Sequence, residues 1–187
     1  HSKGIDTIVC DHHLPGSEIP QALAILNPKQ ADCNYPYKEL CGCGIGYKLI
    51  TAFAIQNNIS TEIADQHLDL VATAIAADIV PVTGENRTLA VLGLAKVNRN
   101  PSIPVQALKM ISEINKTFTI TDLVFIIAPR VNAAGRMDHA NAAYELLMSS
   151  NKEEVRKIAE DLNEKNSERQ NIVTNADLEK LMDTSDE

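Results

Sequence analysis

Three polar residues, Asp11, His12 and His13, follow directly after an apolar run at residues 5–10. We expect this run to be a buried strand of a parallel sheet, which places the three side chains at the carboxyl edge, where open α/β folds bind their ligands. A neutral imidazole is a good ligand for Mn²⁺ or Zn²⁺, and a nearby carboxylate can orient it or share the metal. The tripeptide therefore indicates a metal site, and a polar loop after a strand is the alternative interpretation.

Asp78 lies between the apolar residues Ala77 and Ile79, and Pro81 follows. A carboxylate stranded among apolar side chains is costly unless it is paired or binds a metal. The alternative is an aspartate at a helix C-terminus that faces water, although negative charge is unfavourable at that end of the helix dipole. The combination favours a second metal ligand.

Two arginines, Arg130 and Arg136, flank Asn132 in a polar stretch that contains Gly135. Arginine binds phosphate oxygens through paired hydrogen bonds, so this stretch could contact a phosphate. The alternative is a turn with surface arginines.

The elements that carry these residues are typical of a helix-rich α/β protein with a small parallel sheet and a long C-terminal helix. Strands are expected at 5–10 and 22–26, and a polar loop at 128–137. The helix predicted at residues 60–77 has an apolar stripe formed by Ala64, Leu68, Val71, Ala72 and Ile75. The predicted helices span residues 42–57, 60–77, 86–97 with Asn86 as cap, 104–115, 121–127, 139–149 with Asp138 as cap, and 152 onward.

The composition is that of a soluble globular protein, with 44% apolar and 22% charged residues. No apolar run approaches the ~20 residues of a membrane span and there is no signal peptide, so a cytoplasmic protein without membrane partners is the default expectation. The net charge is −8, and residues 151–187 hold six Lys or Arg against eleven Asp or Glu. This balance argues against autonomous, tight DNA binding. It does not exclude a metal-dependent phosphoesterase, because bound cations offset local acidity.

The four cysteines give a weaker signal. Cys10 lies in an apolar run, where a buried thiol is common. Cys33, Cys41 and Cys43 could be three zinc ligands, but Cys-x-Cys lacks the two-residue gap of the usual zinc hairpins and no second pair exists.

Four motifs follow one another along the chain. They are Asp11-His12-His13 after a strand, Cys41-Gly42-x-Gly44 with Lys48-Leu49, Ala77-Asp78-Ile79-Val80-Pro81 with Gly84-Glu85-Asn86-Arg87, and Pro129-Arg130-x-Asn132-Ala133-Ala134-Gly135-Arg136. In this order they resemble the RecJ branch of the DHH phosphoesterases. The resemblance covers essentially the whole chain, because residues 162–163 and 168–170 also resemble the start of the long helix that joins the two lobes of that family.

The resemblance implies a role for each matching residue. His12 and Asp78 take the positions of metal ligands, and Asp11 lies close to the metal or one shell out. His13 is expected against the scissile phosphate. Arg130, Asn132 and Arg136 match the stretch that faces substrate, whereas His139 has no clear family role and is expected at the surface.

The same resemblance implies a function and its parts. Residues 1–150 would be a partial DHH domain and 151–187 the connecting helix. The intact parent would use Mn²⁺ or Mg²⁺ to hydrolyse single-stranded DNA from the 5′ end, in repair and recombination. The family's upstream aspartates and its C-terminal lobe are not in this sequence. We therefore expect a chain cut at its N-terminus, with too few ligands for two metals and no appreciable activity alone.

Two other functions stay open. The parent could act on oligonucleotides, cyclic dinucleotides or pyrophosphate, although the stretch around Arg130 favours the RecJ branch. It could also be a non-catalytic DHH scaffold. Such domains tend to lose metal residues, whereas His12, His13 and Asp78 are kept here. The oligomeric state is left open.

Overall fold

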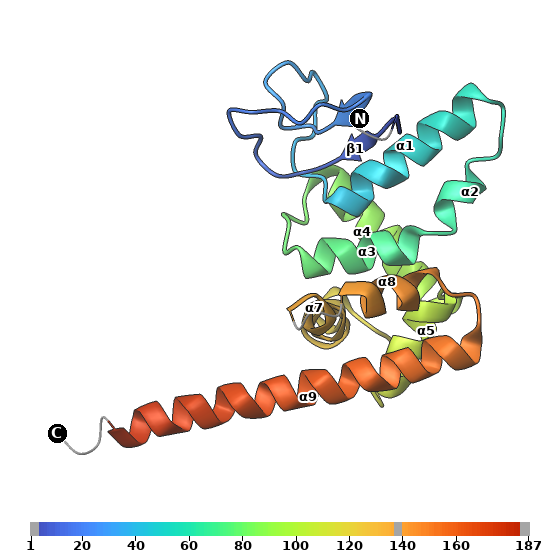
Figure 1. The fold of residues 1–187 in the computed structure, drawn as a ribbon. Coiled ribbons are helices and arrows are strands. Elements are labelled where there is room, and N and C mark those ends of the chain that lie inside the picture. The colour runs from blue at the N-terminus through green and yellow to red at the C-terminus, as the bar shows by residue number, and fades with distance from the viewer. Residues whose placement is uncertain (1–3, 137–139, 184–187) are drawn as a thin grey trace. The chain divides into compact units, whose positions relative to one another are not determined.

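The computed structural model describes residues 4–136 and 140–183, and the chain divides into two compact units. Unit 1 comprises His1–Ser102 and Thr117–Val124, and unit 2 comprises Ile103–Lys116 and Phe125–Glu187. Each unit has its own packed helices. The fold is the predicted one, a helix-rich α/β arrangement with a small parallel sheet and a long C-terminal helix (Figure 1).

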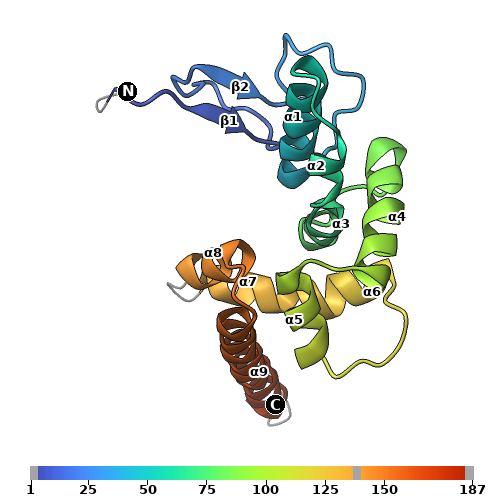
Figure 2. The same ribbon diagram turned by 90° about the vertical axis from the view of Figure 1, so that its right-hand side faces the viewer.

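The sheet of unit 1 has two parallel strands, β1 (Ile8–Cys10) and β2 (Ala24–Leu26), with Val9 opposite Ile25. Further hydrogen bonds extend the pairing at both ends, from Leu23 N to Thr7 O and from Asp11 N to Leu26 O. The strands lie side by side next to α1 (Gly42–Gln56) in Figure 2. The sheet therefore ends with Asp11 beside the end of β2.

The prediction that these strands are buried is wrong. Val9 and Ile25, in the middle of each strand, are half-buried, but their neighbours are exposed, as is the thiol of Cys10. Side chains alternate between the two faces of a strand, so a two-stranded sheet that packs on one side leaves every second residue in solvent. The exposed apolar residues of this region are Ile5, Ile8, Leu23 and Leu26.

The core of unit 1 is helical. Helix α3 (Leu68–Ala77) packs against α4 (Gly84–Arg99) and against α1. A Cβ on Gly93 would collide with the carbonyl oxygen of Leu68, so only glycine permits this close approach of α3 and α4. The predicted stripe is confirmed, because Ala64, Leu68, Val71, Ala72 and Ile75 are all buried. The single helix predicted at 60–77 is instead two, α2 (Glu62–Asp65) and α3.

Asn86 does not cap α4. The helix begins at Gly84 after Thr83, so Asn86 lies inside its first turn and its side chain is fully buried. At the other end of α4, Asn98 binds the backbone of Phe118 twice. Its Oδ1 accepts from Phe118 N at 2.8 Å and its Nδ2 donates to Phe118 O at 2.9 Å. Residues 117–124, which include the short helix α6 (Ile120–Asp122), are thereby attached to unit 1.

Unit 2 is built on the long helix α9 (Lys152–Asp183), against which α5 (Ile103–Ile111), α7 (Ala128–Arg136) and α8 (Ala140–Met148) pack. The loop predicted at 128–137 is wrong, because α7 occupies it. The alanines of this stretch favour helix. A π-helical turn, Leu123–Ile127, precedes α7. The predicted cap Asp138 and the surface residue His139 lie outside the described residues.

Within residues 4–136 and 140–183, no helix is both long and apolar enough to cross a membrane.

Candidate metal and phosphate site

The structure brings together His12 and Asp78, the two residues predicted as metal ligands. Nε2 of His12 lies 3.6 Å from Oδ2 of Asp78. His12 follows β1, and its ring lies against the start of α1, where a Cβ on Gly42 would contact its Cδ2 at 3.6 Å. Asp78 is the C-cap residue of α3, directly after Ala77. An imidazole nitrogen and a carboxylate oxygen thus converge from two separate elements.

Asp11 and His13 form a second pair next to the first. Oδ1 of Asp11 accepts hydrogen bonds from the ring Nδ1 of His13 at 2.7 Å and from the backbone N–H of His12 at 2.8 Å. The hydrogen bond from His13 holds the pKa of Asp11 below its ordinary value, against the opposing effect of burial. This bond places the proton on Nδ1 of His13 and directs its Nε2 away from Asp11. The rings of His12 and His13 lie 4.4 Å apart between centroids.

Asn27 supports the DHH segment from β2. It is buried, and its Nδ2 donates to the backbone oxygen of His13 at 2.8 Å while its Oδ1 accepts from Lys29 N at 3.0 Å. The end of β2 thereby fixes the backbone that carries both histidines. In the sequence, Asn27 is marked only by its place directly after the strand predicted at residues 22–26.

The His12 nitrogen and the Asp78 oxygen are donor atoms that suit a hard or borderline cation such as Mn²⁺, which accepts imidazole and carboxylate ligands. Among the residues that the structure describes, no group of three or more His, Cys, Asp or Glu side chains is arranged to hold a metal ion. Asp11 is engaged with His13, and the cysteines 33, 41 and 43 do not form such a group either. The described residues therefore bring together one imidazole and one carboxylate, those of His12 and Asp78.

The three predicted phosphate-binding residues lie on α7, in unit 2. Arg130 donates through Nε to Oδ1 of Asn163 on α9 at 2.8 Å and through Nη1 to Ile126 O at 2.6 Å. Burial lowers the pKa of the Arg130 guanidinium. Asn132 is exposed. Arg136 ends α7, and its side chain lies outside the described part of the structure.

A further polar cluster in unit 1 was not predicted. Glu85 accepts from Lys48 Nζ at 2.8 Å and from Tyr35 OH at 2.7 Å. Burial would raise the pKa of Glu85, but the hydrogen bonds from Lys48 and Tyr35 outweigh it and lower that pKa overall. Lys48 and Glu85 stood in the motifs that carried the resemblance, without a role. Their pairing joins α1 to α4.

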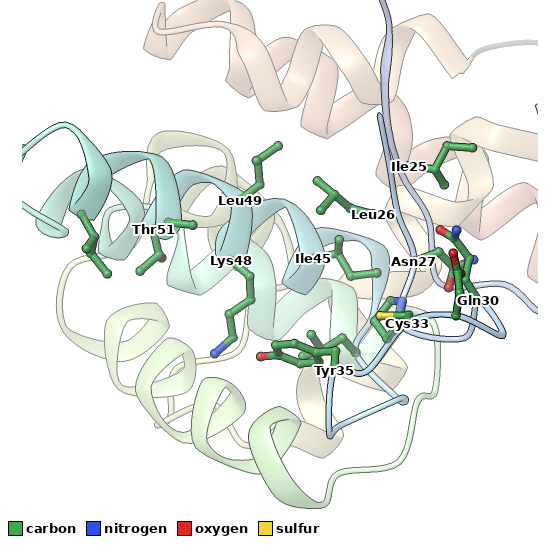
Figure 3. A pocket seen from close by; sticks show the side chains of 15 residues that line it. Ile25, Leu26, Asn27, Gln30, Cys33, Tyr35, Ile45, Lys48, Leu49 and Thr51 are labelled. Atoms are coloured by element: carbon green, nitrogen blue, oxygen red, sulfur yellow. The ribbon is translucent and has the colours of Figure 1, made fainter. Parts of the chain in front are cut away.

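Lys48 and Tyr35 also line a cavity of about 600 Å³ in unit 1 (Figure 3). The cavity lies between β2, the segment after it and α1, and its walls are mainly apolar, with Leu26, Ile45 and Leu49 among them. None of Asp11, His12, His13 or Asp78 lines it. The His12–Asp78 and Asp11–His13 pairs therefore lie outside this cavity.

Comparisons with known proteins match these observations. Residues 1–75 match the model of the DHH family, N-terminal domain. The single-stranded-DNA-specific exonuclease RecJ of Bacillus subtilis (strain 168) is 40% identical over 173 residues, which are 91% of this chain and 21% of that protein. The protein of the same name from Escherichia coli (strain K12) is 36% identical, over 96% of this chain and 33% of that protein. The chain thus spans a fifth to a third of the length of these curated relatives.

Solved structures give the same result for the fold. The crystal structure of RecJ in complex with Mn²⁺ from Thermus thermophilus superposes with a TM-score of 0.81 at 28% identity, over 96% of this chain and 26% of that one. A crystal structure of exonuclease RecJ bound to manganese gives 0.81 at 30% identity, over 97% of this chain and 45% of that one. The resemblance predicted from the four motifs is confirmed.

Proposed function

We propose, from the premise that this chain is a RecJ-type protein of the DHH family, that it contributes part of the metal-dependent site of a single-stranded-DNA exonuclease. The observation that carries the proposal is the pairing of His12 with Asp78, at 3.6 Å between Nε2 and Oδ2. Two motifs that are far apart in the sequence meet there with the donor atoms that Mn²⁺ accepts. The relatives include RecJ structures with Mn²⁺ and with Mg²⁺, which supports a divalent cation.

In this proposal His12 and Asp78 are ligands, and Asp11 lies next to the metal or one shell out. When bound, divalent cations in such sites make a nucleophile from water and stabilise the attacking and leaving oxygens of a phosphodiester. Two ligands are fewer than a two-metal site needs. We therefore infer that further ligands come from beyond the residues that the structure describes, and that the chain alone holds metal weakly.

His13 is proposed to contact the scissile phosphate. Asp11 accepts from its Nδ1 at 2.7 Å, which orients the ring and keeps Nε2 available as the second nitrogen. A protonated imidazole held in this way donates from Nε2 to a phosphate oxygen. The exposure of the His13 side chain, at 78%, leaves room for such a substrate.

Arg130, Asn132 and Arg136 are proposed as phosphate contacts from α7. Two donors of Arg130 already bind Asn163 and Ile126, so a phosphate would use the rest of its five donors. The assignment of residues 1–150 to the DHH domain and of 151–187 to a connecting helix belongs to the same proposal, as do the 5′ polarity, a role in repair and recombination, and a cytoplasmic location.

The test compares the 187-residue chain with a protein of the relatives' full length that contains it. We expect Mn²⁺-dependent release of mononucleotides from single-stranded DNA by the longer protein and none by the chain alone. The same assay, run with a dinucleotide, a cyclic dinucleotide and pyrophosphate, separates the exonuclease from other DHH phosphoesterases. A longer protein that binds DNA but hydrolyses none of these substrates with Mn²⁺ would overturn the proposal in favour of a scaffold.

A further inference from the structure

Residues 79–83, which follow Asp78, have no regular secondary structure to fix their position. Ile79 has a positive φ of 53°, a conformation that a β-branched residue rarely adopts, and its side chain is 79% exposed. The backbone N–H of Asp78 is held by α3, through a hydrogen bond to Ala74 O at 2.9 Å, whereas the segment that leaves Asp78 depends on contacts from other parts of unit 1.

Asn86 provides one of these contacts. Its Nδ2 donates to two backbone oxygens, of Pro81 at 3.0 Å and of Glu39 at 2.5 Å. The side chain is fully buried, and its Oδ1 has no hydrogen-bond partner among the described residues. A buried acceptor without a partner costs free energy, so the two donated bonds are what make an amide favourable at this position.

Tyr37 provides the other. Its hydroxyl lies 2.7 Å from Thr83 O and 3.2 Å from Pro81 O. A Cβ on Gly84, which has a φ of +47°, would lie 2.6 Å from the Tyr37 ring. The Tyr37 ring therefore packs against a position that only glycine can occupy. Its hydroxyl lies within hydrogen-bond distance of the backbone oxygens of Thr83 and Pro81.

These contacts connect the backbone segments next to both proposed ligands, His12 and Asp78. Glu39, which Asn86 binds, lies shortly before Gly42, and the ring of His12 rests on Gly42. Pro81, which Asn86 also binds, follows Asp78. One amide thus ties the backbone on which His12 rests to the backbone that leaves Asp78, and Tyr37 reinforces the second of these attachments.

We propose that Asn86 and Tyr37 are positioning residues, which hold the carboxylate of Asp78 at the distance from His12 that a shared cation requires. This inference rests on the proposed function. Metal–ligand distances are fixed within about 0.2 Å, so a small displacement of Asp78 weakens binding.

The experiment uses the full-length protein that contains this chain and two variants, Asn86→Asp and Tyr37→Phe. Asn86→Asp keeps the shape but replaces the donors with an acceptor. Tyr37→Phe keeps the ring on Gly84 and removes the hydroxyl. The matched control is Tyr47→Phe, which removes a hydroxyl that donates to Asp65 at 2.8 Å, elsewhere in unit 1. Mn²⁺ binding is titrated through the electron paramagnetic resonance of the free ion, alongside the Mn²⁺ dependence of single-stranded DNA hydrolysis.

We expect the Mn²⁺ concentration for half-saturation to rise about 10- to 100-fold in Asn86→Asp, as for loss of a residue that orients a metal ligand. We expect a rise of about 3- to 10-fold in Tyr37→Phe, the equivalent of one hydrogen bond. Tyr47→Phe should stay at the wild-type value. Saturating Mn²⁺ should restore most of the kcat of Tyr37→Phe.

Unchanged half-saturation in both variants, with a lower kcat that Mn²⁺ does not restore, would overturn the positioning role and leave a purely structural one. Wild-type protein that does not bind Mn²⁺ at all would overturn the proposed function, and this inference with it. The two failures are thus distinguished by the wild-type titration alone.

Discussion

Nε2 of His12 and Oδ2 of Asp78 lie 3.6 Å apart, although one residue follows a strand near the start of unit 1 and the other ends its third helix. The side chain of His12 is mostly buried, whereas that of Asp78 is 39% exposed. The pair is therefore open to solvent from the side of Asp78. A cation could reach it without rearrangement of the core.

Substitution of either member of this pair should remove metal-dependent activity. In the full-length protein, His12→Ala and Asp78→Asn should each lower Mn²⁺-dependent hydrolysis of single-stranded DNA at least about 100-fold, because even loss of an outer partner of a metal ligand costs about 10- to 100-fold. The control is His67→Ala, an exposed histidine that precedes α3 and makes no side-chain cap. Equal rates for His12→Ala and His67→Ala would show that His12 is not a ligand.

The Glu85 cluster should make the stability of unit 1 depend on pH. The pKa of Glu85 is lowered on folding from its ordinary 4.5, so its stabilising contribution is present above pH 4.5 and is lost as the pH falls through the folded pKa. At pH 7, Glu85→Gln should lower the free energy of unfolding by at most about 1 kcal/mol, since the pair with Lys48 is partly exposed.

Urea unfolding of Glu85→Gln and wild type between about pH 3 and pH 9 measures this difference. The pKa of Lys48 is raised above 10.5, so its contribution should persist to alkaline pH and be lost only as the pH rises through that raised value. Glu39→Gln, which breaks the longer Lys29–Glu39 pair at 3.3 Å, is the control and should change stability less. A Glu85→Gln difference that grows as the pH falls toward the acid end of this range would contradict the assignment.

Gly93 should tolerate no larger residue. Gly93→Ala places a methyl group against Leu68 O and 2.6 Å from Ala72 Cβ, so α3 and α4 must separate. We expect a loss of about 1–3 kcal/mol in the free energy of unfolding. Gly46→Ala in α1 is the matched control, because nothing lies within 4 Å of its added methyl group and alanine favours helix by up to about 1 kcal/mol. Thermal unfolding that ranks the two variants the other way round would contradict this packing.

We expect Arg130 to contribute to the binding of single-stranded DNA rather than to the binding of the metal. Arg130→Lys removes the planar donor group, so we expect a higher KM for single-stranded DNA with an unchanged Mn²⁺ half-saturation. Asn163→Ala removes only the partner of Nε and should have a smaller effect on KM. A change in Mn²⁺ half-saturation in Arg130→Lys, with KM unaltered, would be inconsistent with a phosphate contact. Steady-state kinetics at several Mn²⁺ concentrations separate the two.

Parts of the fold could be predicted from the sequence, because the patterns that indicate them are local. Apolar spacing identified the buried face of α3, and the order of four motifs identified the family. The break between α2 and α3 was missed, because Ala64 and Leu68 continue one stripe across it. The helix at Ala128–Arg136 was missed because polar residues and Gly135 were weighed above its alanines.

The sequence points to the residues of the proposed site but not to the side chains that support them. Asp11, His12, His13 and Asp78 stand out by residue type beside apolar runs. Asn86, Tyr37 and Asn27 act through backbone oxygens of distant residues, and no residue-type pattern encodes a carbonyl partner. The sequence predicts Asn86 as a helix cap, because a short amide side chain just before a helix is the usual sign of one.

The double attachment of Phe118 to Asn98 has a practical consequence for any attempt to dissect the chain. The polypeptide passes between the two units after Ser102, after Lys116 and after Val124. A chain shortened at Ser102 would lose Phe118, which is almost fully buried, and with it the two hydrogen bonds that the amide of Asn98 makes to the Phe118 backbone. A protease that nicks the stretch between Ser102 and Thr117 would instead leave the two pieces bound to each other, and they should co-elute until a denaturant releases them.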